Sequence, residues 1–247
     1  RQSPSTALAD VAQSVTGVIL GIFLFCHMAF TSSVQISKDL FANLINTSGG
    51  MFMFAEEQAW LHVVFVGFIT LCVVIHAFCA LRRFPTSYHQ LRDIKAHYKM
   101  LRHEDTTLWM VQLVTAFLLF IFVFPHLISM LCNPHGFDVN LIGVHTHHMG
   151  MIYTFVFLVI TELHGMIGLY RLAVKWDIFA KNPETDIIDQ RNGDRAGLRK
   201  TFLFIALLMI VCGTLTAWKN YSIGAELIEN GQEATRYVLA DENNWWK

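Results

Sequence analysis

Five long stretches of the chain contain no Asp, Glu, Lys or Arg, and each approaches or exceeds the length needed to cross a bilayer. They cover residues 11–37, 58–81, 109–132, 139–161 and 201–218. A helix needs about 20 mostly apolar residues to span a hydrocarbon core. The pattern predicts an all-α integral membrane bundle with transmembrane helices at about 11–34, 58–84, 107–132, 147–176 and 199–221. Residues 177–198 are expected to form a polar loop and 223–247 a polar tail, within a single domain covering 1–247.

Basic residues are concentrated in two of the four connections between these helices. Six Lys or Arg residues lie between positions 82 and 102, and seven lie between positions 171 and 200. The first connection has only Lys38, and the third has none. By the positive-inside rule, the N-terminus and both basic connections lie in the cytoplasm, and the C-terminus lies on the outer side.

The composition supports a membrane protein and excludes several other classes. Hydrophobic residues make up 54% of the chain and charged residues only 15%, whereas about a quarter of a soluble domain is charged. The five cysteines form no CxxC pair, so they indicate small core side chains, not a disulfide framework or an iron–sulfur site. The net charge of −1 identifies no partner, and no nucleic-acid partner is expected.

Four of the twelve histidines lie well inside the predicted spans, one on each of the first four helices. At 1.5 Å per residue, His76 and His164 are roughly 12 and 17 Å from the cytoplasmic ends of their helices. His27 and His126 are roughly 24 and 28 Å from the corresponding ends. Depth therefore sorts the four histidines into an inner pair and an outer pair.

Two imidazoles at matched depth on different helices suit a six-coordinate haem iron. A single buried histidine is more often an ordinary core residue, but four that pair by depth favour two haems held between helices 1–4. Zinc is the chemical alternative, although it usually needs a third protein ligand that these pairs lack.

Glu162 is the other ionisable residue at mid-membrane depth, where charge costs several kcal/mol unless it is paired or hydrated. It lies two residues before His164 and so points to a different face of the helix. Proton transfer is one interpretation, and a structural hydrogen bond from a protonated carboxyl group to a backbone carbonyl is the alternative.

Other polar residues gather near the predicted outer ends. His145, His147 and His148 precede the fourth span. His62, near Glu56 and Glu57, begins the second. A hydrated loop or an ordinary helix start explains them, and proton exchange at the mouth of a quinol site is the functional alternative.

Four motifs resemble the dihaem cytochrome b subunit of bacterial quinol:fumarate reductases. They are QS-x-TG-x-x-LG-x-F before His27, HAF-x-A-x-R-x-FP from His76, RH-x-DTTLW from Arg102, and ELHG-x-x-GLYRLAVKW from Glu162. The resemblance covers roughly residues 10–176. It implies that His27 and His126 ligate a distal haem b, and that His76 and His164 ligate a proximal one.

The resemblance also implies roles for residues near both membrane faces. In the family, certain positions approach the propionates of the proximal haem, and the matching residues here are Gln13, Ser14, Trp109 and Lys175. Glu162 matches a carboxylate linked to transmembrane proton transfer. The outer quinol-site carboxylate has no unambiguous counterpart, and Glu56 and Glu57 are the candidates.

The function implied is that of the menaquinol-oxidising membrane anchor of a fumarate reductase in the bacterial inner membrane, with a periplasmic C-terminus. Electrons would pass through two haems to iron–sulfur and flavoprotein subunits on the cytoplasmic side. The complex is expected to be a dimer of heterotrimers. The anchor of a menaquinone-linked succinate dehydrogenase shares this design. A dihaem cytochrome of a hydrogenase or formate dehydrogenase, and a histidine-bearing metal transporter, are further alternatives.

Overall fold

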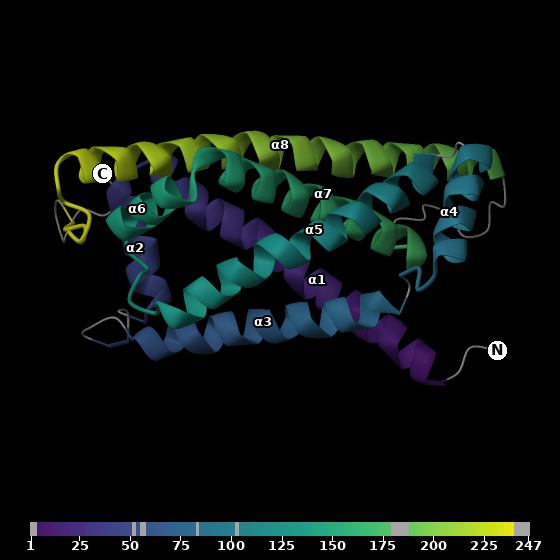
Figure 1. Cartoon of the computed structure of the whole chain (residues 1–247), viewed down its shortest axis with the longest axis horizontal. Helices are drawn as coiled ribbons and strands as arrows, with labels where there is room; N and C mark the ends of the chain where they lie inside the picture. Colours follow the sequence, from purple (N-terminus) through teal and green to yellow (C-terminus); the bar gives the residue numbers. More distant parts are fainter. Residues whose placement is uncertain are drawn as a thin grey trace. The chain divides into compact units, whose positions relative to one another are not determined.

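The computed structural model describes residues 4–50, 53–54, 58–82, 84–101, 104–178 and 188–239. These parts of the chain form helices and no strand. The α-helices, in chain order, are α1 (Pro4–Ser32), α2 (Lys38–Ser48), α3 (Ala59–Leu81), α4 (Tyr88–Leu101), α5 (Glu104–Cys132), α6 (Val139–Met149), α7 (Met151–Lys175) and α8 (Ile188–Glu229) (Figure 1).

The prediction of an all-α chain with five membrane spans is confirmed. The candidate spans are Ser5–Gln35, Ala59–Leu81, Glu104–Cys132, Met151–Lys175 and Arg195–Glu229. The last helix is much longer than predicted: α8 begins at Ile188, inside the stretch 177–198 that was expected to be a loop. Polarity alone does not distinguish a solvated helix from a solvated loop, which is why the hydropathy pattern misplaced this boundary.

Two short helices flank the spans, and each begins with a side-chain cap. The Ser37 hydroxyl accepts a hydrogen bond from the Leu40 amide at the start of α2. Asp138 accepts from the amides of Asn140 and Leu141 at the start of α6. Gly150 then separates α6 from α7 with a positive φ of 80°, a backbone conformation that residues other than glycine rarely adopt. The predicted helix 147–176 therefore begins only at Met151, and His147 belongs to α6.

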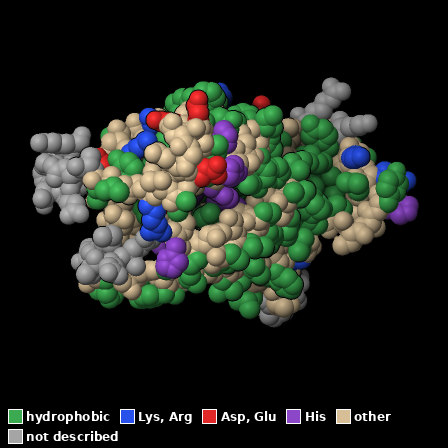
Figure 2. Space-filling model, turned by 60° about the vertical axis from the view of Figure 1, so that its left-hand side comes forward, with side chains coloured by type: hydrophobic (Ala, Val, Ile, Leu, Met, Phe, Trp, Pro, Cys, Tyr) green, Lys and Arg blue, Asp and Glu red, His purple; other side chains and the backbone are tan. Residues whose placement is uncertain are grey.

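The spans expose apolar side chains and pack through small residues. Phe78 and Ile152 are more than three-quarters exposed, and hydrophobic side chains cover much of the face shown in Figure 2. Lipid tails are as apolar as these side chains, so close backbone packing becomes important in holding such helices together. A Cβ added to Gly224 would lie only 2.2 Å from the carbonyl oxygen of Gly143, which shows how closely α8 approaches α6.

The chain divides into two compact units, and the division cuts all five spans. Unit 1 contains Arg1–Ile22, Leu71–Phe120 and Ile160–Leu208. Unit 2 contains Phe23–Thr70, Ile121–Val159 and Met209–Lys247. Each unit therefore holds one end of every spanning helix and is described by itself.

Unit 2 has a hydrophobic core to which the segment after α8 contributes. Its buried residues are Val34, Phe41, Ala42, Ile45, Val139 and Ile223. Tyr237 and Leu239 pack against this cluster. The Tyr237 amide donates to the Asp138 carboxylate, and its hydroxyl donates to Asp39 over 2.9 Å. Two acidic side chains thus hold the segment after α8 against α2 and α6.

The Tyr237 contact gives this segment a defined pH dependence. Burial, followed by the hydrogen bond to Asp39, raises the pKa of Tyr237 to about 12. The stabilisation is therefore complete below the unfolded pKa of about 10 and is lost as the pH rises through about 12. Tyr237→Phe should remove about 0.5–1.5 kcal/mol of local stability and abolish the pH dependence.

Tryptic cleavage after the exposed Arg236 measures this effect, because cleavage requires local release of the chain. We expect faster cleavage in Tyr237→Phe at pH 8. Val238→Ala is the control, since Val238 is 82% exposed, and it should cleave at the wild-type rate. An unchanged cleavage rate in Tyr237→Phe would contradict the assignment.

Candidate functional site

The four mid-span histidines fall into the two units as depth predicted. His76 on α3 and His164 on α7 belong to unit 1. His27 on α1 and His126 on α5 belong to unit 2. Each side chain is partly buried within an apolar span. The structure thus brings one pair of imidazoles into each unit.

His27 and His126 face one another in unit 2. Their ring centroids are 6.5 Å apart and the ring planes are inclined by 70°. Phe23 stacks on His27, with centroids 5.3 Å apart, and Phe157 lies 5.5 Å from His126. Two metal–imidazole bonds of about 2 Å each, together with half of each ring, span a distance of this size. The pair is therefore spaced so that both imidazoles could hold one haem iron.

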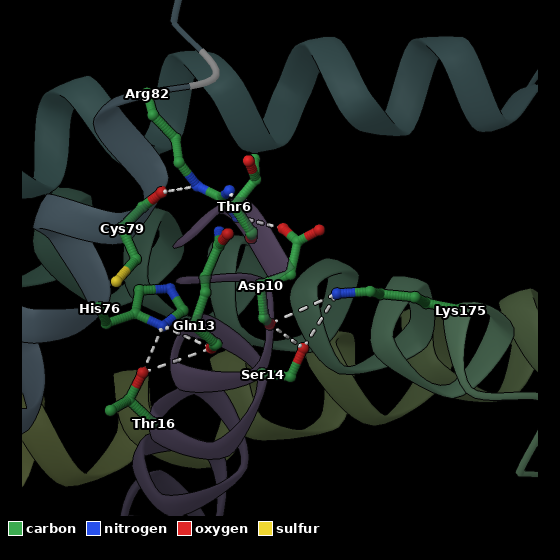
Figure 3. A network of polar contacts seen from close by, with 9 residues as sticks. All are labelled: Thr6, Asp10, Gln13, Ser14, Thr16, His76, Cys79, Arg82 and Lys175. Carbon is green, nitrogen blue, oxygen red and sulfur yellow. Dashed lines mark hydrogen bonds and ion pairs between the residues drawn. The ribbon is translucent and has the colours of Figure 1, made fainter. Parts of the chain in front are cut away.

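His76 is held by α1 within unit 1 (Figure 3). Its Nδ1 atom lies 3.2 Å from the Gln13 carbonyl oxygen and 3.3 Å from the Thr16 hydroxyl. A Cβ at Gly17 would lie 3.2 Å from the imidazole, so a small residue at this position admits the ring. With Nδ1 engaged, Nε2 is the nitrogen left for a metal.

His164 is held by α5 in the same way. Its Nδ1 atom lies 3.3 Å from the Gln112 carbonyl oxygen and 3.3 Å from the Thr115 hydroxyl. The residues that hold the two unit 1 histidines share one sequence, Gln-x-Val-Thr, at 13–16 and at 112–115. Sequence reasoning missed Thr16, Gln112 and Thr115, although this repeated tetrapeptide was the available signal.

Polar groups that the sequence assigned to haem propionates gather at one end of α1. Lys175 donates to the Ser14 hydroxyl over 3.1 Å and lies 3.4 Å from the Asp10 carbonyl oxygen (Figure 3). Gln13 reaches the same region through its carbonyl oxygen, beside His76. Trp109 is half-buried near the start of α5. Ser14, Gln13 and Lys175 therefore lie together in unit 1, where the Lys175 ammonium group is a cation suited to an anionic group.

Further charged residues of unit 1 join the same helix ends and had no assigned role. Arg82 donates to the Cys79 and Thr6 carbonyl oxygens and pairs with Asp10, which fixes the end of α3 against α1 (Figure 3). Arg171 donates to the side-chain oxygen of Gln112. These contacts position the segments that carry the Gln-x-Val-Thr sequences.

Asp105 joins three helices of unit 1. The buried Tyr170 on α7 donates to it over 2.7 Å, and Arg199 on α8 lies 3.6 Å away. Arg199 also pairs with Glu104. The start of α5 is therefore anchored to both α7 and α8 beside the candidate site.

Glu162 is completely buried in unit 1. Within the described part of the chain, neither of its carboxyl oxygens has a hydrogen-bond partner. The structural alternative, a bond to a neighbouring backbone carbonyl, is thus not seen among these residues. Its carboxyl group is therefore buried without a partner among these residues, and proton transfer through Glu162 stays a prediction.

The predicted quinol-site carboxylates, Glu56 and Glu57, lie outside the described residues. His62, which was predicted to lie close to them, packs in unit 2 against Phe137, with ring centroids 4.3 Å apart, and lies 3.2 Å from the Ser48 hydroxyl. His147 stacks on Tyr221. Among the described residues, no group of three or more His, Cys, Asp or Glu side chains could hold a metal ion.

Comparison with known proteins places these features in context. The profile of the succinate dehydrogenase/fumarate reductase transmembrane subunit family matches residues 89–216. The fumarate reductase cytochrome b subunit of Helicobacter pylori is 34% identical over 100% of this chain and 93% of its own length. The subunit of the same name from Wolinella succinogenes is 33% identical over 87% of this chain and 82% of its own.

Proposed function

The chain belongs to the succinate dehydrogenase/fumarate reductase transmembrane subunit family, and we propose that it is the menaquinol-oxidising membrane anchor of a fumarate reductase. The observation that carries this proposal is the facing pair His27 and His126, with ring centroids 6.5 Å apart inside an apolar bundle. Two opposed imidazoles at this separation are suited to hold one metal ion between them. The names of the relatives support the same function.

Four histidines would hold two b haems, one pair in each unit. His27 and His126 would hold the haem in unit 2, and His76 and His164 would hold the haem in unit 1. When bound, haem supplies reversible one-electron redox chemistry, which connects the two-electron oxidation of a quinol to one-electron carriers. The chain's own task is to hold both sites in fixed positions within one membrane.

The polar end of α1 in unit 1 would receive the haem propionates. The Lys175 ammonium group supplies a positive charge, and the Ser14 hydroxyl lies within 3.1 Å of it. Gln13 and Trp109 would provide further polar contacts, as the resemblance implies. A cation and neutral donors at the membrane rim stabilise an anionic group that the hydrocarbon core would exclude.

The partners follow from the same assignment. Flavoprotein and iron–sulfur subunits would bind on the cytoplasmic side, where the basic residues of α4 and of the connection after α7 would lie. The complex would reside in the bacterial inner membrane as a dimer of heterotrimers. The N-terminus of this chain would lie in the cytoplasm and its C-terminus in the periplasm. Fumarate would be reduced on the flavoprotein.

Absorption spectra of the purified protein test this function. Reduction with dithionite should give the narrow bands of low-spin b haem, with two haems per chain by pyridine haemochrome assay. The assembled complex should then oxidise a menaquinol analogue with fumarate. A colourless protein would favour the metal-transporter alternative, and preferential succinate oxidation would assign the complex as a succinate dehydrogenase.

Proton release from quinol is the second part of this proposal. A carboxylate at the outer rim accepts a quinol proton directly or through one water. We expect Glu56→Gln or Glu57→Gln to lower menaquinol oxidation by at least about tenfold, as for loss of a general base. Electron transfer from a soluble dye to fumarate should remain normal. Asp39→Asn, at a carboxylate bound to Tyr237, is the control. Wild-type quinol turnover in both single variants and the double variant would rule out this role.

A further inference from the structure

We infer that the two Gln-x-Val-Thr segments, at 13–16 and 112–115, fix the tautomer of His76 and His164 and lower the reduction potential of the haem they would share. This inference rests on the proposed function and adds Thr16 and Thr115 as positioning residues. Neither threonine would touch the iron. Each would act through the histidine that it contacts.

The hydrogen-bonding chemistry determines where each imidazole proton lies. The Gln13 carbonyl oxygen, 3.2 Å from His76 Nδ1, can only accept a hydrogen bond. The Thr16 hydroxyl has one proton, which it donates to the Ala12 carbonyl oxygen over 2.7 Å. Its oxygen is therefore left to accept from Nδ1, 3.3 Å away. Two acceptors at Nδ1 require the proton there and leave the Nε2 lone pair for a metal.

The same reasoning applies to His164. The Gln112 carbonyl oxygen accepts, and the Thr115 hydroxyl donates to the Val111 carbonyl oxygen over 2.9 Å. The Thr115 oxygen is thus also an acceptor for His164 Nδ1. Both histidines of unit 1 present the same tautomer, and each is oriented by a carbonyl and a hydroxyl three residues apart on a neighbouring helix.

The histidines of unit 2 lack this arrangement. In the described part of the chain, the rings of His27 and His126 contact aromatic side chains and form no hydrogen bond. Hydrogen bonding from Nδ1–H makes a ligating imidazole more basic and a stronger electron donor. A stronger donor stabilises oxidised iron more than reduced iron, which lowers the reduction potential. Only one of the two haems should therefore be sensitive to these threonines.

Replacing each threonine with valine tests the inference, because valine keeps the shape and removes the hydroxyl. Thr16→Val and Thr115→Val should each raise the midpoint potential of the same single haem, and the double variant should raise it further. A tenfold change in the redox equilibrium equals about 59 mV for a one-electron couple, and we expect up to this shift per threonine. The low-spin EPR signal of that haem should change as well.

The matched control is Thr70→Val on α3, since the Thr70 hydroxyl bonds the Val66 carbonyl oxygen of its own helix and no other group in the described part of the chain. It should leave both potentials unchanged. Thr16→Ser and Thr115→Ser retain the hydroxyl and should keep the wild-type potential. If a valine variant loses haem while its serine variant keeps it, the hydroxyl is required and the inference holds.

Three outcomes would overturn the inference. In the first, both haems keep their wild-type midpoint potentials in the double valine variant. In the second, the midpoint potential of the haem held by His27 and His126 shifts instead. In the third, the serine variants lose haem together with the valine variants. Failure of the proposed function is separate, because the wild-type protein would then show no haem spectrum at all.

Discussion

His164→Ala is expected to remove one of the two haems and to stop electron transfer from quinol to fumarate. The methyl group that replaces the imidazole cannot ligate iron, and the site loses half of its axial ligation. His164 is also held at Nδ1 by Gln112 and Thr115, so the substitution removes an imidazole with a fixed orientation. The pyridine haemochrome assay should fall from two haems to one per chain.

The pairing itself is tested by comparing four variants. His76→Ala should remove the same haem as His164→Ala, whereas His27→Ala and His126→Ala should both remove the other. The exposed His89 on α4 provides the control, and His89→Ala should retain both haems. Two low-spin haems in purified His164→Ala would refute the assignment of His76 and His164 as a pair.

Glu162→Gln is expected to abolish menaquinol-driven fumarate reduction while both haems remain bound. Electrons that move inward from an outer quinol site work against the membrane potential, at about 2.3 kcal/mol per charge per 100 mV. A proton that moves inward with each electron cancels this charge movement. Glu162, completely buried and with no hydrogen-bond partner in the described part of the chain, is suited to carry it.

The measurement separates proton transfer from structural damage. Fumarate reduction by a soluble dye that donates directly to the hydrophilic subunits should stay normal in Glu162→Gln. The haem content should also stay at two per chain. Thr161→Val, at the neighbouring position on α7, is a control for packing and should keep its quinol activity. If energised membranes containing Glu162→Gln reduce fumarate with menaquinol at the wild-type rate, Glu162 is not the proton carrier.

The start of α8 and the short structural elements were the parts of the fold that the sequence did not predict. Long apolar runs reveal spans because the bilayer imposes a minimum length on them. Neither α2 nor the separate α6 has to satisfy such a length, and each depends on a local cap, at Ser37 and at Asp138. The break at Gly150 depends on a backbone angle that hydropathy does not encode.

The chain by itself determined the five spans and the grouping of the mid-span histidines into two pairs. Both follow from one-dimensional rules: apolar length sets a span, and residue count along a helix sets depth. Only the tertiary structure decided that His27 and His126 face one another, because helix rotation and crossing are set by packing. It also decided that Gln13 and Gln112 present carbonyl oxygens to His76 and His164. Every residue of the chain carries a backbone acceptor, and such an acceptor becomes specific only where another helix brings a donor to it.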